Sequence, residues 1–144
     1  MSFRAFVSEY PYISDVLTNT VVVKYNNLET SEVALWDTGA SITFVSREVV
    51  KSLNLIPIGK EDILTPSGLF TSNTYLLDIL LPNDIIIPNI LVQDSEIGAQ
   101  GIGVLIGMDI INQGDFSVSN FNGKTVFTYR KPSRERIDYV SNQK

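Results

Sequence analysis

Short apolar stretches rich in β-branched and aromatic residues recur along the chain, and clusters of Asn, Asp, Pro and Gly separate them. Residues 21–25 (VVVKY) are typical of these stretches, and Asn26 and Asn27 behind them favour a turn because both tolerate positive φ. Further turn signals lie at residues 65–68 and at Asn122-Gly123. The pattern predicts an all-β fold of about eight short strands.

Two short helices and one irregular strand complete this prediction. Ser46 is a favourable N-cap for a helix over residues 47–54, and residues 108–113 form a second helix of one or two turns. Pro88 interrupts the apolar stretch at residues 85–92, which indicates an edge strand or a β-bulge.

The chain of 144 residues has the length of one domain. Its charge is uneven, since residues 124–144 hold 6 Lys and Arg against 2 Asp and Glu, whereas the whole chain has a net charge of −5. We interpret the basic end as a solvated tail; contact with an acidic partner is the alternative. We expect three parts: an N-terminal arm (1–20), a folded domain (21–130) and a mobile basic C-terminal tail (131–144).

Composition excludes several kinds of chemistry. The chain has no His and no Cys, which removes Ser-His-Asp and Cys-His nucleophiles, disulfides and the usual zinc sites. Acid–base chemistry near neutral pH would have to come from carboxylates, Lys or Tyr. The acidic body argues against nucleic acid as a partner, because phosphate binding needs a basic face. We expect no metal and no cofactor.

Neither a membrane anchor nor a signal peptide is apparent. No apolar stretch approaches the roughly 20 residues that a spanning helix needs. The first twelve residues lack an apolar core followed by a small-residue cleavage site. We therefore expect a soluble, cytoplasmic protein that does not bind membranes.

One stretch, residues 35–46 (LWDTGASITFVS), places a carboxylate in a tight polar turn between apolar segments. Gly39 lacks a Cβ, so substrate and another backbone can approach Asp37 closely. Thr38 offers a hydroxyl that can lock one such loop against another. A pair of carboxylates that shares one proton can activate water for peptide hydrolysis without a metal. An ordinary Asx-type turn is the alternative interpretation of Asp37.

The Asp-Thr-Gly triplet occurs once in the chain. One carboxylate is not a pair, so a hydrolase of this kind needs Asp37 from a second copy. Such an enzyme would be an obligate homodimer with its active site on the two-fold axis.

Three segments in this order resemble the single-lobed retropepsin-like (retroviral-type) aspartic proteases. They are residues 33–41 (VALWDTGAS), a hairpin whose tip lies at residues 65–69, and residues 104–111 (VLIGMDII). The resemblance covers about residues 20–130, and it implies an acid-protease barrel with one or two short helices, active as a homodimer. The domain over residues 21–130 would then be the protease domain.

The resemblance also assigns roles to residues. It implies that Asp37 is catalytic and that four neighbours support the active-site loop: Thr38, Gly39, Ala40 and Ser41. The hairpin corresponds to a flap that closes over substrate: Thr65, Pro66, Ser67, Gly68, Leu69 and Phe70. Ile106 and Gly107 correspond to a turn that supports the catalytic loop. Candidates for side-chain pockets are Ile42, Leu69, Phe70 and Val104.

One position differs from pepsin-like enzymes, although retroviral-type enzymes share its Ala, and another differs from the retroviral-type enzymes themselves. Ala40 stands where pepsin-like enzymes carry Ser or Thr, which removes a hydrogen bond that favours charged catalytic carboxylates. We therefore expect a pH optimum between mildly acidic and near neutral. Met108 replaces an Arg that retroviral enzymes pair with an Asp near the catalytic loop. Support for the dimer must come from elsewhere, with Asp109 and the terminal strands as candidates.

The sequence therefore predicts an aspartic endopeptidase that cleaves extended polypeptides. A catalytically silent retropepsin-like module, which binds peptides or dimerises, is the alternative. A carboxylate-pair glycosidase would need two acids about 5–10 Å apart in one sugar cleft, and nothing in the sequence places such a pair within one chain.

Overall fold

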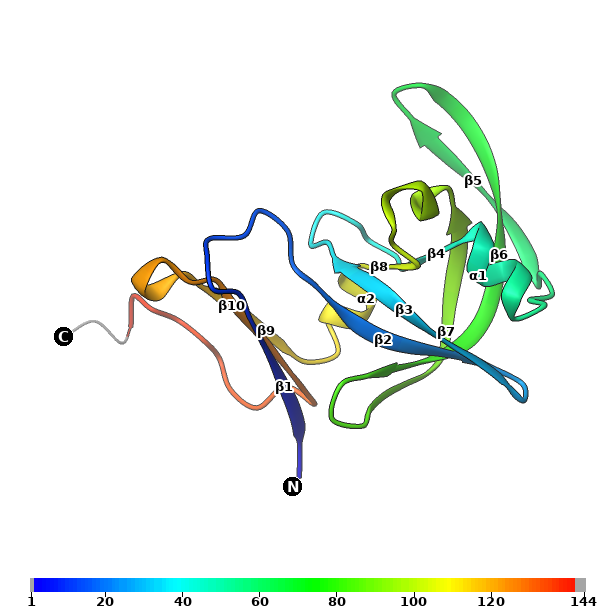
Figure 1. Cartoon of the computed structure of the whole chain (residues 1–144). Helices are drawn as coiled ribbons and strands as arrows, with labels where there is room; N and C mark the ends of the chain where they lie inside the picture. Colours follow the sequence, from blue (N-terminus) through cyan, green and yellow to red (C-terminus); the bar gives the residue numbers. More distant parts are fainter. Residues whose placement is uncertain (1, 142–144) are drawn as a thin grey trace.

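The computed structural model describes residues 2–141, except for the side chain of Thr65, and shows two sheets beside each other (Figure 1). The larger sheet has the strand order β2-β3-β8-β4-β7-β6-β5, and β2 also pairs with β6, which closes six of the strands into a barrel. Its strands are β2 (Thr18–Tyr25), β3 (Leu28–Trp36), β4 (Phe44–Ser46), β5 (Gly59–Thr65), β6 (Gly68–Leu81), β7 (Ile85–Ser95) and β8 (Val104–Ile106).

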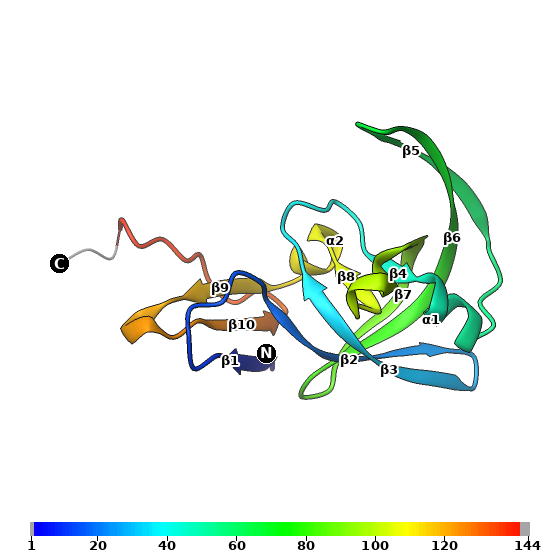
Figure 2. The same ribbon diagram turned by 45° about the horizontal axis from the view of Figure 1, so that its top comes forward.

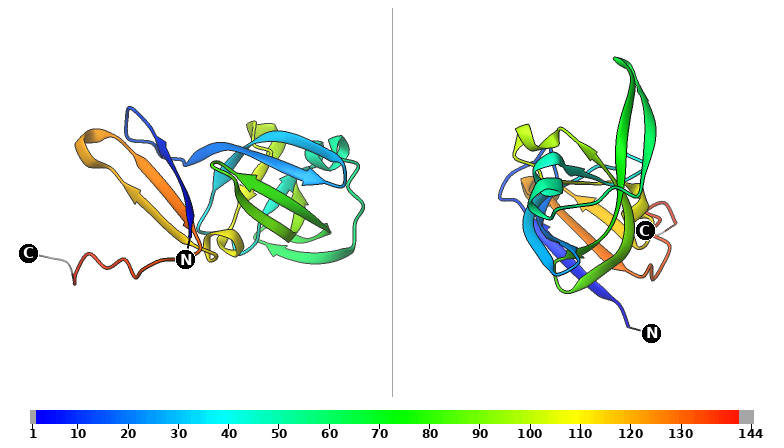
Figure 3. Two further views of the ribbon diagram at one scale, coloured as in Figure 1. Left: turned by 90° about the horizontal axis from the view of Figure 1, so that it is seen from below. Right: turned by 90° about the vertical axis from the view of Figure 1, so that its right-hand side faces the viewer.

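The smaller sheet joins the two ends of the chain. Its strands are β1 (Arg4–Glu9), β9 (Asp115–Ser119) and β10 (Val126–Lys131), in the antiparallel order β1-β10-β9. The register places Phe6 opposite Tyr129. Seen from below, this sheet lies to one side of the barrel (Figure 3, left). The first twenty residues thus contain a complete strand and the beginning of β2.

Four short helical segments connect the strands. They are α1 (Arg47–Ser52), α2 (Met108–Ile111) and the 3₁₀ turns η1 (Ile97–Gln100) and η2 (Phe121–Gly123). The Ser46 side chain caps α1 by accepting a hydrogen bond from the Val49 amide at 3.2 Å, as the sequence predicts. Across residues 2–141, no helix is long and apolar enough to cross a membrane.

The barrel core follows the alternation of its strands. In β6 every second residue from Tyr75 to Leu81 is buried. In β7 the alternation shifts between Ile87 and Ile90, because Pro88 and Asn89 together oppose Asp78. Asn89 has φ 51° and donates its amide to Asp78 Oδ1 at 2.7 Å. Because β7 lies between β4 and β6, Pro88 marks a bulge and not an edge strand.

An aromatic cluster joins the two sheets at the end of β3. The Trp36 ring stacks on Phe116 with centroids 5.4 Å apart and lies 5.2 Å from Tyr129. Phe6 and Phe127 complete the cluster. Burial of several rings supplies a large apolar area at one place. The cluster therefore fixes the small sheet against the residue that directly precedes Asp37.

Ten strands are present in residues 2–141, against the predicted number of about eight. The difference includes β1, whose pairing partner lies at the other end of the chain. Nothing local in residues 4–9 indicates that pairing.

Candidate active site

Asp37 begins a tight turn at the end of β3, in the loop that projects beside the small sheet (Figure 1). Its amide donates to Ile106 O at 2.9 Å, and its carbonyl accepts from the Ala40 amide at 3.2 Å. The Gly39 amide donates to Asp37 Oδ1 at 2.8 Å. The carboxylate is half-buried, whereas Thr38 and Gly39 are exposed. The turn therefore fixes one carboxylate oxygen and presents the group at the surface.

The step from β8 into α2 lies directly against this turn. The Met108 amide donates to Ala40 O at 2.8 Å. A Cβ on Gly107 would lie 2.4 Å from Ile42 O and 2.9 Å from Ala40 O, closer than non-bonded atoms allow. Only glycine lets the two backbones approach this closely. The structure thus brings Ile106 and Gly107 into contact with the loop that they are predicted to support.

A buried polar cluster closes the far end of the same loop. Asp109 accepts hydrogen bonds from Thr43, through Oδ2 from the amide at 3.0 Å and through Oδ1 from the hydroxyl at 2.7 Å. The Thr43 hydroxyl also accepts from the Gly107 amide at 3.1 Å. Thr43 is fully buried. Thr43 has no predicted role, because the only signal at this position in the sequence is a lone hydroxyl within an apolar stretch.

The hairpin of β5 and β6 extends away from the barrel (Figures 2 and 3, right). Thr65 pairs with Gly68, so Pro66 and Ser67 form the tip, and Gly68 has φ 126°, which favours glycine. Ile63 pairs with Phe70 and Leu64 pairs with Leu69. Because neighbouring residues of a strand point to opposite faces, both faces of the hairpin carry apolar side chains.

A cavity of about 410 Å³ lies between this hairpin and the barrel. Phe44, Ile63 and Phe70 supply its apolar lining, and Arg47, Asp94 and Glu96 its charged lining. Arg47 and Glu96 form an exposed ion pair. Among the predicted pocket residues, Phe70 lines the cavity. Val104 is fully buried in the barrel core, so the structure does not support it as a pocket residue.

Known proteins resemble this chain in structure. No protein-family model matches the chain, and no curated protein matches its sequence. A retropepsin-like aspartic protease from Rickettsia conorii superposes with a TM-score of 0.59 over 91% of this chain and 97% of that chain, at 16% identity. This chain has the retropepsin-like fold.

Two viral proteases share the retropepsin-like fold with it. The simian foamy virus (mac) protease has a TM-score of 0.51 at 21% identity, with 67% of this chain and 92% of that chain covered. EIAV protease, solved with the inhibitor HBY-793, has a TM-score of 0.51 at 20% identity, with 72% and 90% covered. The predicted all-β barrel with short helices is confirmed.

In this retropepsin-like fold, Asp94 attaches the base of the hairpin to the barrel. Its Oδ1 accepts from the Ser72 hydroxyl at 2.8 Å and its Oδ2 from the Tyr75 hydroxyl at 3.2 Å. Burial raises the pKa of Tyr75, and the nearby Asp94 carboxylate adds to this. Tyr75 therefore stays a neutral donor at neutral pH, and these hydrogen bonds fix the base of the hairpin to the barrel.

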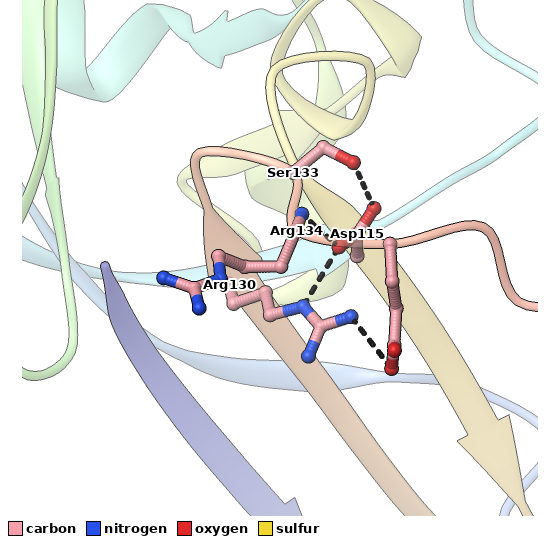
Figure 4. Close-up of polar contacts among 5 residues, drawn as sticks. Asp115, Arg130, Ser133 and Arg134 are labelled. Carbon is pink, nitrogen blue, oxygen red and sulfur yellow. Dashed lines mark hydrogen bonds and ion pairs between the residues drawn. The ribbon is translucent and has the colours of Figure 1, made fainter. Parts of the chain in front are cut away.

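A second carboxylate attaches the C-terminal segment to the small sheet (Figure 4). Asp115 accepts from the Ser133 hydroxyl at 2.5 Å, the Arg134 amide at 2.8 Å and Arg130 Nε at 2.7 Å. The Ser133 hydroxyl and the Arg134 amide hold the pKa of Asp115 well below its usual range. Nothing local in the sequence indicates this structural role of Asp115.

Proposed function

We propose that the chain is an aspartic endopeptidase whose active site forms between two copies. One observation carries the proposal: Asp37 is held in a hydrogen-bonded turn at the surface of a retropepsin-like fold. Each copy supplies one Asp37 carboxylate. Two carboxylates about 3 Å apart cannot both ionise easily, so the pair shares one proton and titrates in two steps.

The shared proton gives the two carboxylates different tasks. The ionised carboxylate takes a proton from the bound water as the water oxygen attacks the scissile carbonyl carbon. The protonated carboxylate gives its proton to the carbonyl oxygen. Collapse of the tetrahedral intermediate breaks the C–N bond: the leaving nitrogen takes the proton that the first carboxylate removed from water, and a hydroxyl of the intermediate returns its proton to the second carboxylate. No metal and no covalent intermediate is required.

The neighbouring residues have supporting roles in this proposal. Thr38 is exposed beside Asp37, where its hydroxyl can bond to the loop of the second copy. Gly39 leaves room for substrate: a Cβ there would lie only 3.1 Å from Asp37 Oδ1. Ala40 and Ser41 continue the loop, and Ala40 O accepts the amide of Met108. Ala40 adds no hydroxyl, so we propose a pH optimum between mildly acidic and near neutral.

The hairpin tip is proposed to close over an extended polypeptide. The substrate would lie between the tip, residues 65–70, and the Asp37 pair. Backbone hydrogen bonds would hold it as an added strand, and apolar pockets would select its side chains. The cavity beneath Phe70 supports this arrangement, because its lining is partly aromatic and opens beside the hairpin.

The deciding experiment compares cleavage of a peptide library by the wild type and by Asp37→Asn. We expect the variant to lose at least about a thousandfold in rate, because it cannot act as base. The control is Asp84→Asn, since Asp84 is an exposed turn residue at φ 59° and Asn tolerates that conformation. A statine-type transition-state analogue should inhibit the wild type.

Two other results would reject the proposal. Cleavage that persists in Asp37→Asn would show that another group acts. Equal peptide binding by the wild type and by Asp37→Asn, with no cleavage by either, would support the silent peptide-binding module.

A further inference from the structure

The cavity between the hairpin and the barrel has two kinds of lining. Its apolar lining comes from Phe44 on β4, Ile63 on β5 and Phe70 on β6. Its polar lining includes the carboxylates of Asp94 and Glu96. The volume of about 410 Å³ lies within the range of roughly 300–1,000 Å³ that is usual for ligand pockets. Such a cavity fits a group that is apolar along its length and polar at its end.

Negative charge prevails around this cavity. Asp94 and Glu96 line it directly. Thr71, which also lines it, donates to the Oδ1 of a third carboxylate, Asp62, at 3.0 Å. Arg47 is the one cation among the lining residues of the described chain, and the whole chain has a net charge of −5. Charge complementarity therefore favours a cationic ligand.

Glu96 is the carboxylate best able to bind a cation. Asp94 already accepts hydrogen bonds from Ser72 and Tyr75. The Glu96 side chain is 75% exposed and pairs through Oε1 with Arg47, and an ion pair as exposed as this one is weak. The second oxygen of Glu96, Oε2, can accept from a further donor. A ligand cation can therefore bind Glu96 without disturbing the base of the hairpin.

The backbone that carries Glu96 is held against the neighbouring helix α1. Glu96 directly precedes η1, where Gly98 lies so close to the Glu48 side chain of α1 that a Cβ would overlap with it. Further along the same loop, Gly103 O accepts the amide of Ser46, the N-cap of α1, at 2.9 Å. Figure 1 and the right-hand view of Figure 3 show η1 and the hairpin on the same side of the barrel. The position of Glu96 at the cavity is thus a fixed feature of the fold.

A buried acceptor without a partner lies next to this cavity. The register places Gln93 of β7 beside Phe44 of β4 and Thr74 of β6, so their side chains share one face of the sheet. Phe44 is part of the cavity wall. Gln93 is 9% exposed, and within residues 2–141 its Oε1 has no hydrogen-bond partner. Because an unpaired buried acceptor is costly, a ligand that brings donors is favoured here over an acidic one.

We propose that this cavity binds an arginine or lysine side chain of the substrate. The stem packs between Phe44 and Phe70, since long cationic side chains bury their methylene groups on apolar surfaces and keep the charged head near water. The head pairs with the exposed Glu96. This inference rests on the proposed function, because the hairpin that forms one wall is the segment proposed to close over the substrate. The protease would then select a basic residue at one fixed position of the polypeptide.

The first test uses a peptide that the wild type cleaves, with arginine or citrulline placed at each position in turn. Citrulline has nearly the shape of arginine but no charge. We expect arginine to raise kcat/KM about tenfold over citrulline at one position. The preference should shrink as the salt concentration rises, because an exposed ion pair is screened. Equal rates at every position, or a preference for glutamate there, would overturn the inference.

Variants of the charged residues assign this preference to the cavity. Glu96→Gln should reduce the arginine preference to about twofold, because the carboxylate that pairs with the head is gone. Arg47→Gln should increase it, since Arg47 no longer competes for Glu96. The matched control is Glu29→Gln, because Glu29 is an exposed residue of β3 that does not line the cavity; it should keep the full preference. A preference that survives Glu96→Gln undiminished would overturn the inference.

Peptide binding separates this inference from the proposed function. Fluorescence anisotropy on Asp37→Asn gives the Kd of labelled arginine and citrulline peptides without cleavage. A chain that binds the arginine peptide more tightly, through Glu96, but whose wild type never cleaves, overturns the protease and leaves the basic-residue site. A wild type that cleaves with no preference for arginine overturns the site and leaves the protease.

Discussion

The hydroxyl of Thr43 makes two hydrogen bonds: it donates to Asp109 Oδ1 and accepts the Gly107 amide. Through these bonds one buried side chain joins the end of the loop that carries Asp37 to the start of α2. Asp109, considered from the sequence only as a possible support, is the acceptor that makes this possible.

We expect Thr43→Val to lower the free energy of unfolding by about 1–3 kcal/mol, because it leaves the buried Gly107 amide without an acceptor. Urea unfolding measures this. The rate of peptide cleavage should fall as well, since the loop that holds Asp37 loosens. The control is Thr71→Val on the hairpin, where the exposed hydroxyl donates to Asp62 Oδ1. Equal losses in both variants would contradict a special role for Thr43.

The tip and the base of the β5–β6 hairpin differ in the number of strands that support them. At its tip β5 pairs with β6 alone, whereas further along β6 also pairs with β7 and β2. The hydrogen bonds of a strand pair that has no further neighbouring strand open more easily than those inside a larger sheet. The tip is therefore the part of this hairpin that we expect to open most easily.

Hydrogen exchange should show this gradient. We expect amides of residues 61–71 to exchange faster than those of residues 75–81, and to slow down when a statine-type inhibitor binds. The inhibitor should leave the exchange of β1 and β10 unchanged, which serves as the internal control. Tip amides that stay fast in a saturated complex would argue against a flap.

Asp115 attaches the C-terminal segment to β9 and β10 through three hydrogen bonds, and the ion pair of Glu135 with Arg130 adds a further contact. Its folded pKa lies well below its usual value, so the unfolded chain takes up protons first as the pH falls. The stabilisation is complete above the unfolded pKa of about 4 and is lost as the pH falls toward the folded value.

Asp115→Asn should therefore lower the free energy of unfolding at pH 7, and its difference from the wild type should shrink as the pH falls below about 4. Urea unfolding over a pH series measures this, with Asp84→Asn as the control that shows no such trend. A difference that is constant across the series would mean that the hydrogen bonds to Asp115 do not depend on its charge.

Elements with local signals were predictable from the sequence. Pro66 and Gly68 indicated the hairpin tip, Ser46 indicated the start of α1, and Pro88 indicated the bulge in β7. Each of these signals acts over a few residues. Asp37 stood out for the same reason, because its turn chemistry is contained in one triplet.

Contacts between distant residues were not predictable in the same way. Thr43 and Asp109 are 66 positions apart, and β1 finds β10 at the other end of the chain. In the sequence, Asp115 looks like any acidic residue before an aromatic one. Its contact with the C-terminal segment exists only in the folded structure. Which polar side chains meet is decided only in the folded chain. Such contacts therefore leave no periodic or local pattern in the sequence.

The small sheet forms entirely within one copy of the chain. Strands β1, β10 and β9 pair with each other, and their aromatic residues pack on Trp36 of the same chain. In residues 2–141 the two ends of the chain are thus already joined. The terminal strands, considered from the sequence as support for a dimer, find their first partners inside one copy.

A chain that completes its own ladders can fold before it meets another. Under the proposed shared site, folding and activation become separate events, and the second is an encounter between two finished molecules. In dilute solution the cleavage rate per molecule should then grow in proportion to the protein concentration, which a dilution series would reveal. The concentration of the protein, rather than its folding, would then determine when proteolysis begins, and dilution would stop it.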